Sequence, residues 1–182
     1  MKTNYADMFH ALHPGFFDEG SIRSLPPAYV FEEQILDLRG FSVDDVHIDC
    51  PAHITFGCYS GDLEALRSAV GLVDEDWPQY FNEGDRIYCA FDGDEVVSFC
   101  NLDAFGEYQR LRIGGPGCVG TIPSHRKQGI GLKMVQNATA ILKDEGFDLS
   151  YIHYTHVGHW YARLGYKTIL RWNSGGIISE EL

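Results

Sequence analysis

The sequence lacks the features by which several common classes of protein are recognised. None of its 5 cysteines belongs to a Cys-x-x-Cys pair, and no apolar run approaches the roughly 20 residues that a membrane-spanning helix needs. The first residues, Met-Lys-Thr-Asn-Tyr-Ala-Asp, contain no apolar signal core. We therefore expect a soluble protein of the reducing cytoplasm, without a membrane partner.

Basic residues are also scarce. The chain has 14 Lys and Arg against 26 Asp and Glu, which gives a formal net charge of −12. Nucleic-acid binding draws its affinity from neutralising phosphates with basic side chains, so this charge argues against a nucleic-acid partner. The same charge would attract a cationic small molecule or a basic peptide. The 182 residues, of which 45% are apolar, suffice for one principal domain with its own core.

Metal and dinucleotide sites lack their usual signatures. His153, His156 and His159 recur every third residue, but they would run across a strand, its loop and a helix start, with no Cys pair beside them. We expect ordinary polar histidines and no metal. The Gly-x-Gly-x-x-Gly pattern of residues 115–120 is followed by Thr-Ile-Pro at 121–123, which cannot open the helix that a dinucleotide site requires.

Hydrophobic periodicity separates an N-terminal extension, residues 1–50, from a regular main domain, residues 51–182. The extension contains a short helix over 5–12 and a stretch over 28–38 that fits either a helix or a strand. A polar loop is expected over 106–110. The main domain alternates strands with helices, which indicates a mixed α/β (α+β) sheet layered by helices. We predict strands over 54–59, 86–91, 95–102, 113–122, 149–154 and 166–172, and helices over 63–73, 77–81, 130–142 and 158–164.

The most informative segment joins the strand over 113–122 to the amphipathic helix that follows it. Free N–H groups at a helix start, with the positive end of the helix dipole, can bind a pyrophosphate. Gly129 and Gly131 would let phosphate oxygens reach the main chain, and Arg126 and Lys127 would add positive charge. An ordinary strand-to-helix turn could contain the same residues, so this segment needs a second signal beside it.

A second segment about thirty residues later supplies that signal. Residues 126–131, Arg-Lys-Gln-Gly-Ile-Gly, match the Arg/Gln-x-x-Gly-x-Gly/Ala acyl-CoA loop of the GCN5-related N-acetyltransferases (GNAT family). Residues 161–166, Tyr-Ala-Arg-Leu-Gly-Tyr, match the family's later Tyr-x-x-x-Gly-Phe/Tyr signature. With both motifs in order on a strand and a helix, residues 53–172 resemble this family.

The resemblance implies a fold and a co-substrate. The fold is a mixed, mostly antiparallel sheet of six to seven strands flanked by helices and splayed between the fourth and fifth strands. Acetyl-CoA enters the splayed gap, here between residues 117–121 and 149–154, and a main-chain N–H near its thioester carbonyl polarises that group. The main chain of Val119, Gly120 and Thr121 is expected to pair with the pantetheine arm, and the pyrophosphate is expected to lie against Arg126, Lys127, Gln128, Gly129, Ile130, Gly131 and Leu132.

The resemblance also suggests catalytic groups. Tyr161 stands where many family members keep a tyrosine that protonates the departing CoA thiolate, although a core aromatic would occupy the same position. No Asp or Glu falls within residues 113–122, where some members hold a carboxylate base. His156, Asp103 and Glu107 are the candidate bases, and a water chain is the alternative to all three.

Two departures from the family concern the acceptor side. The Asn that many members place seven residues before the tyrosine is Tyr154 here, and the tail after Tyr166 is short for the usual last two strands. The closing strand is expected from the N-terminal extension or from a partner subunit. Cys118 lies beside the expected thioester, but direct attack by an amine needs no covalent intermediate.

These features predict an acetyl-CoA-dependent N-acetyltransferase. The acceptor would be a primary amine of a small molecule or peptide, with a cationic acceptor favoured by the net charge of −12. A non-catalytic acyl-CoA-binding or sensing module on the same fold is the alternative, because the base is missing from its family position. An acyl group longer than acetyl, and a monomer or a homodimer, remain open.

Overall fold

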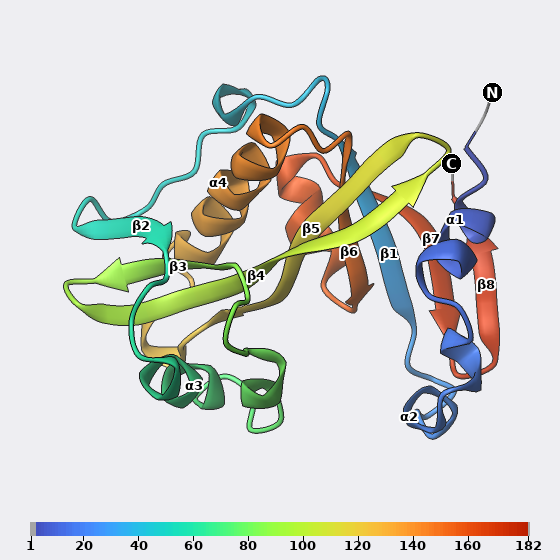
Figure 1. Cartoon of the computed structure of the whole chain (residues 1–182), viewed down its shortest axis with the longest axis horizontal. Helices are drawn as coiled ribbons and strands as arrows, with labels where there is room; N and C mark the ends of the chain where they lie inside the picture. Colours follow the sequence, from blue (N-terminus) through green and yellow to red (C-terminus); the bar gives the residue numbers. More distant parts are fainter. Residues whose placement is uncertain (1–2, 182) are drawn as a thin grey trace.

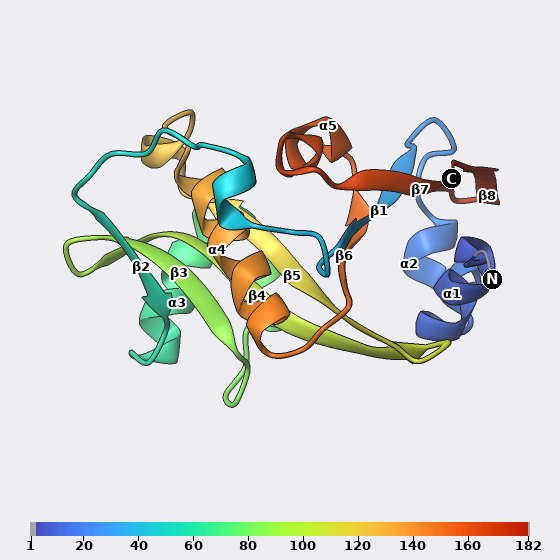
Figure 2. The same cartoon turned by 90° about the horizontal axis from the view of Figure 1, so that it is seen from above.

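A computed structural model describes residues 3–181 as one eight-stranded sheet with helices on both faces (Figures 1 and 2). Helices α4 (Ile130–Asp144) and α5 (Gly158–Tyr161) cover one face, and α1 (Tyr5–Leu12), α2 (Gly20–Arg23) and α3 (Leu63–Gly71) cover the other. Five short 3₁₀ helices complete the set: η1 (Phe16–Asp18), η2 (Val43–Asp45), η3 (Trp77–Tyr80), η4 (Pro123–His125) and η5 (Ala162–Leu164).

The sheet has the strand order β2-β3-β4-β5-β6-β1-β7-β8. Strands β5 and β6 pair in parallel, and all the other neighbours are antiparallel. The predicted mixed, mostly antiparallel sheet is therefore confirmed. The strands are β1 (Phe31–Asp37), β2 (Ile54–Cys58), β3 (Ile87–Asp92), β4 (Glu95–Tyr108), β5 (Leu111–Thr121), β6 (Leu149–Thr155), β7 (Lys167–Asn173) and β8 (Gly176–Glu180).

The sheet contains eight strands rather than six to seven, and β1 accounts for part of this difference. The ambiguous stretch over 28–38 is a strand, not a helix, and it lies between β6 and β7. Ile35 of β1 is opposite Tyr151 of β6 on one side and Lys167 of β7 on the other. The closing strand therefore comes from this chain's own N-terminal segment. The boundary expected at residue 50 falls in the connection between η2 and β2.

The connection between β4 and β5 differs from the polar loop predicted over 106–110. Strand β4 continues to Tyr108 and β5 begins at Leu111, so only Gln109 and Arg110 form the turn. Their φ angles are 48° and 68°, the left-handed values that suit a two-residue hairpin because its twist matches that of the strands. The loop prediction was wrong because neither residue is the Gly or Asn that usually signals such a turn.

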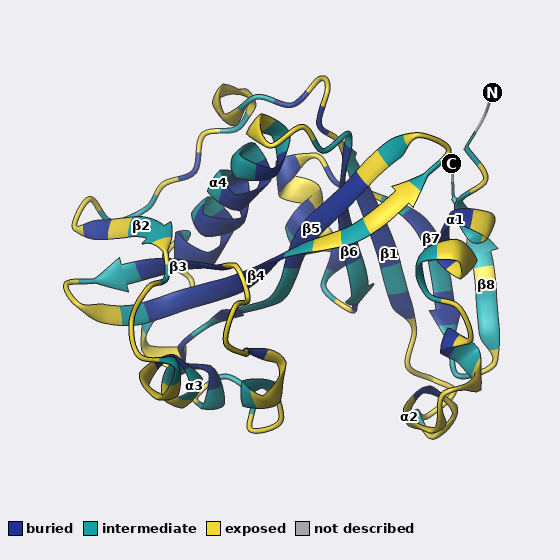
Figure 3. Ribbon diagram, in the orientation of Figure 1, coloured by how far each residue is buried: buried dark blue, intermediate teal, exposed yellow. Residues whose placement is uncertain are grey.

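Helix α4 places its apolar stripe against the sheet as its periodicity predicts. Met134, Val135 and Ala138 are fully buried, and they pack against Cys100 and Leu102 of β4. Figure 3 shows the buried inner side of α4 and the exposed end of the β4–β5 hairpin. The start of α4 is thereby fixed above the central strands.

The central position of β1 predicts that two nearby aromatic residues, Phe31 and Tyr29, contribute very differently to the stability of the fold. Phe31 is 8% exposed and stacks on Trp172 of β7 at 4.8 Å between ring centroids, whereas Tyr29 is 57% exposed. We predict that Phe31→Ala lowers the free energy of unfolding by about 3 kcal/mol. Tyr29→Ala is the matched control and should change it by less than about 0.5 kcal/mol. Urea denaturation measures both, and equal effects would contradict the placement of β1.

Candidate functional site

Strands β5 and β6 pair at only two positions. Ile113 is opposite Leu149 and Gly114 is opposite Ser150. Beyond these positions β5 continues to Thr121 and β6 to Thr155, and the two strands no longer pair with each other. Figure 1 shows the two strands diverging toward their carboxyl ends. They are the fourth and fifth strands in the order that begins at β2. The splay between the fourth and fifth strands is therefore confirmed.

Strand β5 contains a bulge within the diverging segment. Phe99 of β4 is opposite Gly120 and Asn101 is opposite Gly117, so Cys118 and Val119 together face the single residue between them on β4. Cys118 has a φ of 46°, which is unusual for a residue other than glycine. A bulge leaves one residue out of the ladder and redirects its main-chain groups. Here it changes the direction of polar main-chain groups on the side of β5 that faces the splay.

The start of α4 lies directly beside the end of β5. A Cβ atom on Gly131 would lie 2.6 Å from Oγ1 of Thr121, so only glycine allows this close approach. The Nε of Arg126 donates a hydrogen bond of 2.9 Å to the carbonyl of Thr121, which ties the connecting loop back to the strand. Lys127 in this loop has a φ of 63°.

The N-terminus of α4 has no cap from the protein. The N-cap residue, Gly129, supplies no side chain, and no acidic residue lies in the first turn. The main-chain N–H groups of residues 129–132 donate no hydrogen bond to any group within residues 3–181. Four free donors and the positive end of a 15-residue helix make this place suited to an anion.

Tyr161 lies on the α4 side of the sheet, at the end of α5. Its side chain packs in the same apolar cluster as Cys100 and Val119, so it lies near the β5 bulge. Burial, together with the nearby Tyr166 hydroxyl, raises the pKa of the phenol well above its ordinary value. The hydroxyl makes no hydrogen bond within residues 3–181, although buried tyrosines usually pair this group.

The three candidate bases occupy different surroundings. Asp103 lies over β5, with an Oδ2 atom 2.2 Å from where a Cβ on Gly117 would be, and burial followed by the charge of Asp85 raises its pKa. Glu107 is exposed near the tip of the β4–β5 hairpin, beside the paired end of β5. His156 is exposed on the bend after β6. The structure brings only Asp103 close to the diverging part of β5.

Cys118 is not placed as a reactive thiol. It packs against the α3 side of the sheet, where burial and the charges of Asp103 and Asp74 raise its pKa to about 11. A thiol with this pKa is almost fully protonated at neutral pH and is a poor nucleophile. This environment argues against Cys118 as a nucleophile.

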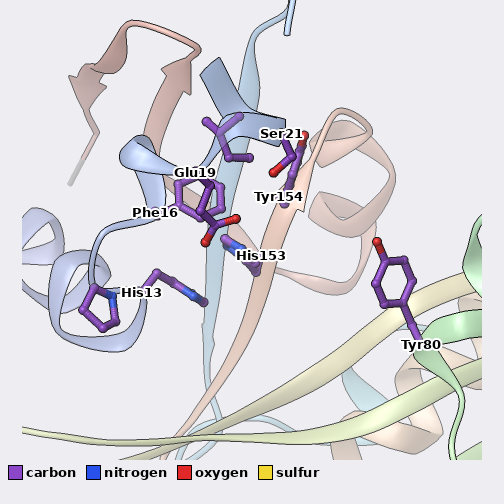
Figure 4. A pocket seen from close by; sticks show the side chains of 9 residues that line it. His13, Phe16, Glu19, Ser21, Tyr80, His153 and Tyr154 are labelled. Atoms are coloured by element: carbon purple, nitrogen blue, oxygen red, sulfur yellow. The ribbon is translucent and has the colours of Figure 1, made fainter. Parts of the chain in front are cut away.

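A cavity of about 510 Å³ opens on the sheet face opposite α4, between the N-terminal segment and η3 (Figure 4). Figure 4 shows Tyr80 facing the group formed by His13, Glu19 and His153 from across the opening. The only charged carboxylate among its lining residues is Glu19, and no Lys or Arg within residues 3–181 lines it. Its walls are formed by His13, Pro14, Phe16, Glu19, Ser21, Ile22, Tyr80, His153 and Tyr154.

Comparison with known proteins identifies this arrangement. Residues 83–168, from just before β3 to the first residues of β7, match the family model described as an acetyltransferase (GNAT) domain. These residues form a GNAT domain. The matched segment includes the β5 bulge, the start of α4 and Tyr161. The sheet accordingly has the GNAT fold, with β1 in the place next to β7.

Solved structures of GNAT proteins share this fold. One is a GCN5-related glucosamine N-acetyltransferase region of a fungal multi-domain GH3 β-N-acetylglucosaminidase, with 20% identity over 94% of this chain and a TM-score of 0.65. Others are GCN5-related N-acetyltransferases from Sphaerobacter thermophilus (16% identity, 94% of this chain, TM-score 0.61) and Kribbella flavida (19%, 85%, 0.55). This chain spans 23%, 55% and 60% of those three chains, respectively. The search of curated proteins returned no match.

Two further observations concern the described part of the chain. No helix within residues 3–181 has both the length and the apolar character required to cross a membrane. Over the same residues, no three His, Cys, Asp or Glu side chains form a group that could hold a metal ion. His153 instead bonds to Glu33, while His156 and His159 are exposed.

Two glycines test the close packing at the start of α4. Gly129 has a φ of 77°, and a Cβ atom there would lie 2.0 Å from the carbonyl oxygen of Asp49, whereas Gly15 has a φ of 75° with nothing within 4 Å. Gly15→Ala should therefore cost only the backbone strain, about 1 kcal/mol. We predict that Gly129→Ala costs at least about 1 kcal/mol more, because the Asp49 segment must also move. Chemical denaturation measures the loss in free energy of unfolding for both variants. Equal losses would contradict the close contact between Gly129 and the Asp49 carbonyl.

Proposed function

We propose that this chain transfers an acetyl group from acetyl-CoA to a primary amine of a small molecule or a peptide. The observation that carries the proposal is the uncapped start of α4, where four consecutive N–H groups are free. This start lies beside the end of β5, whose edge toward β6 is unpaired beyond Gly114. A diphosphate needs such donors, and an extended pantetheine arm needs such a strand.

The loop and helix start fit the pyrophosphate of CoA in several respects. The first turn of α4 contains no carboxylate that would repel phosphate, and Arg126 and Lys127 lie just before it. Gly129 and Gly131 allow the main chain to approach closely. In this proposal the main chain of residues 127–132 surrounds the pyrophosphate, and the side chain of Gln128 contributes little.

The bulged part of β5 is suited to the thioester end of acetyl-CoA. Pantetheine would pair with the main chain of Val119, Gly120 and Thr121, on the edge that β6 leaves unpaired. A main-chain N–H released by the bulge would then polarise the thioester carbonyl. In this way acetyl-CoA would complete the sheet between β5 and β6.

The free hydroxyl of Tyr161 supports transfer rather than binding alone. The amine nitrogen bonds to the carbonyl carbon of the thioester and the carbon–sulfur bond breaks, after which the CoA sulfur takes the hydroxyl proton of Tyr161. A proton from the attacking nitrogen then restores the phenol. Because burial raises the pKa of Tyr161, this group stays protonated until the thiolate forms.

The cavity on the face opposite α4 is the proposed acceptor site. It reaches β6 at His153 and Tyr154, across the splay from β5, and Glu19 makes it favourable for a cationic group. Small polyamines, amino sugars and peptide amino groups all meet this description. Glucosamine deserves inclusion in an acceptor panel because the fungal structure of the same fold is a glucosamine N-acetyltransferase region.

We also propose that the chain acts in the cytoplasm. All five cysteines are free thiols in the structure, and Cys89 and Cys100 are buried without a partner. A reducing compartment is the usual setting for such thiols.

Isothermal titration with acetyl-CoA tests the proposed diphosphate site. Gln128→Glu adds a negative charge beside the free N–H groups, so we predict a three- to tenfold rise in the Kd of acetyl-CoA that shrinks at high salt. Gln109→Glu, at the distant turn of the β4–β5 hairpin, is the matched control and should leave the Kd unchanged. An unmeasurable binding heat with the wild type, or equal effects of both variants, would contradict the site.

The role of Tyr161 is tested by measuring CoA release with putrescine, spermidine, glucosamine and a lysine-containing peptide. Tyr161→Phe should lower kcat by about 10²-fold or more, because the variant removes the hydroxyl group that donates the proton. The Kd of acetyl-CoA should stay within about twofold, because the aromatic ring is kept. If acetyl-CoA binds and no amine in the panel is acetylated, the chain is a non-catalytic acyl-CoA-binding module. Unchanged turnover by Tyr161→Phe would remove this residue from the reaction.

A further inference from the structure

A carboxylate from the N-terminal segment lies in the core beneath the proposed acceptor cavity. Glu33 of β1 is 0% exposed, and its side chain accepts hydrogen bonds from four donors on the two neighbouring strands. Those donors are the hydroxyl of Tyr151, Nδ1 of His153 (2.9 Å), the main-chain N–H of Tyr154 (3.1 Å) and Nε1 of Trp172 (2.7 Å). The indole and main-chain N–H groups can only donate, so this environment suits an ionised carboxylate.

This carboxylate fixes both the ring and the protonation pattern of His153. Because the Nδ1 of His153 lies against a carboxylate, it carries the proton, and Nε2 of the neutral ring is left with its lone pair. The ring is stacked on His13 at 3.9 Å between centroids and is 5.2 Å from the ring of Phe16. His153 therefore cannot turn freely, and it lines the cavity with its unpaired edge.

The strand that carries His153 is itself shaped by Glu33. Glu32 is opposite Thr155 and Gln34 is opposite Ile152, so His153 and Tyr154 together face Glu33 across a bulge in β6. Tyr154 has a φ of 58°, and its N–H is the one that Glu33 accepts. The carboxylate thus holds the distorted backbone that directs His153 into the cavity.

We propose that His153 is the general base of the transfer and that Glu33 is its positioning residue. The inference rests on the proposed function, since it assigns a role within the same reaction. An incoming ammonium gives one proton to Nε2 of His153, and the free nitrogen then attacks the thioester. The imidazolium that forms is stabilised by the charge of Glu33, as a carboxylate does for a catalytic histidine in other enzymes. The proton later leaves for solvent.

The surroundings of His153 favour a positive charge on only one of the two stacked rings, His13 and His153, at a time. Burial and the charge of His153 lower the pKa of His13 to about 3, so His13 remains a neutral stacking partner at the pH of the reaction. The other titratable groups that face the ring are Glu33 on β1, Tyr151 and Tyr154 on β6, and Glu19 and Tyr80 across the cavity. Glu19 is the remaining carboxylate available to attract a cationic acceptor.

Substitution of His153 by Asn tests the base. The Asn amide nitrogen can replace Nδ1 as donor to Glu33, but nothing replaces Nε2. We predict that kcat at pH 7 falls about 10²-fold with the Kd of acetyl-CoA unchanged. The deficit should shrink about tenfold for each pH unit toward the pKa of the amine, because the free amine then forms without a base. His10→Asn, on the exposed side of α1, is the matched control and should keep the wild-type profile.

Glu33→Gln tests the positioning role. The amide retains the size of the side chain but loses one acceptor, so kcat should fall about tenfold or more with the acidic side of the pH profile displaced. Should this variant not fold, His153→Asn still decides the proposal. A nitrogen-15 NMR spectrum of the wild type with acetyl-CoA provides a reading that needs no acceptor: the neutral His153 ring should carry its proton on Nδ1.

The outcomes separate this inference from the function on which it rests. Absence of acetyl-CoA binding would remove the proposed function. If the wild type acetylates an amine but His153→Asn keeps its rate and pH profile, only the inference is wrong. A loss confined to His156→Asn, or a His153 proton found on Nε2, would overturn it as well.

Discussion

The end of pairing between β5 and β6 is the constraint on which the site depends. Gly115 comes so close to β6 that a Cβ atom on it would lie 1.9 Å from the carbonyl oxygen of Tyr151, and beyond this point the strands separate. The start of α4 lies at the open end of β5, and the cavity lies on the other face of the sheet. Donor and acceptor can therefore approach one gap from opposite sides.

Strand β1 closes the sheet and also contributes Glu33 beneath the proposed acceptor cavity. It occupies the place between β6 and β7, so its side chains lie within a two-sided core, and Phe31 and Ile35 fill it with apolar surface. Glu33 and Gln34 are the buried polar residues of this strand. The carboxylate of Glu33 is tolerated there because donors from β6 and β7 surround it. One short segment thus provides both structural closure and the polar contact beneath the cavity.

The sequence predicted the β5–α4 turn and the segment around Tyr161 better than the surroundings of the proposed acceptor cavity. Residues 126–131 and 161–166 are local motifs, so their places on a strand-to-helix turn and a helix end follow from short-range pattern. Glu33 and His153 are 120 positions apart and meet only because β1 pairs with β6. No local pattern predicts that pairing, and the two adjacent acidic residues Glu32 and Glu33 within the strand were the one available sign. Strand β8 was missed because its five residues follow a turn with little periodicity.

Backbone amide NMR during a titration with acetyl-CoA tests the central claim most directly. If the diphosphate binds the free start of α4 and the pantetheine arm binds the open edge of β5, the amides of residues 119–121 and 129–132 should shift most and exchange more slowly with solvent. Saturable binding that leaves these amides unchanged, with its largest shifts in β2 or β8, would contradict the account.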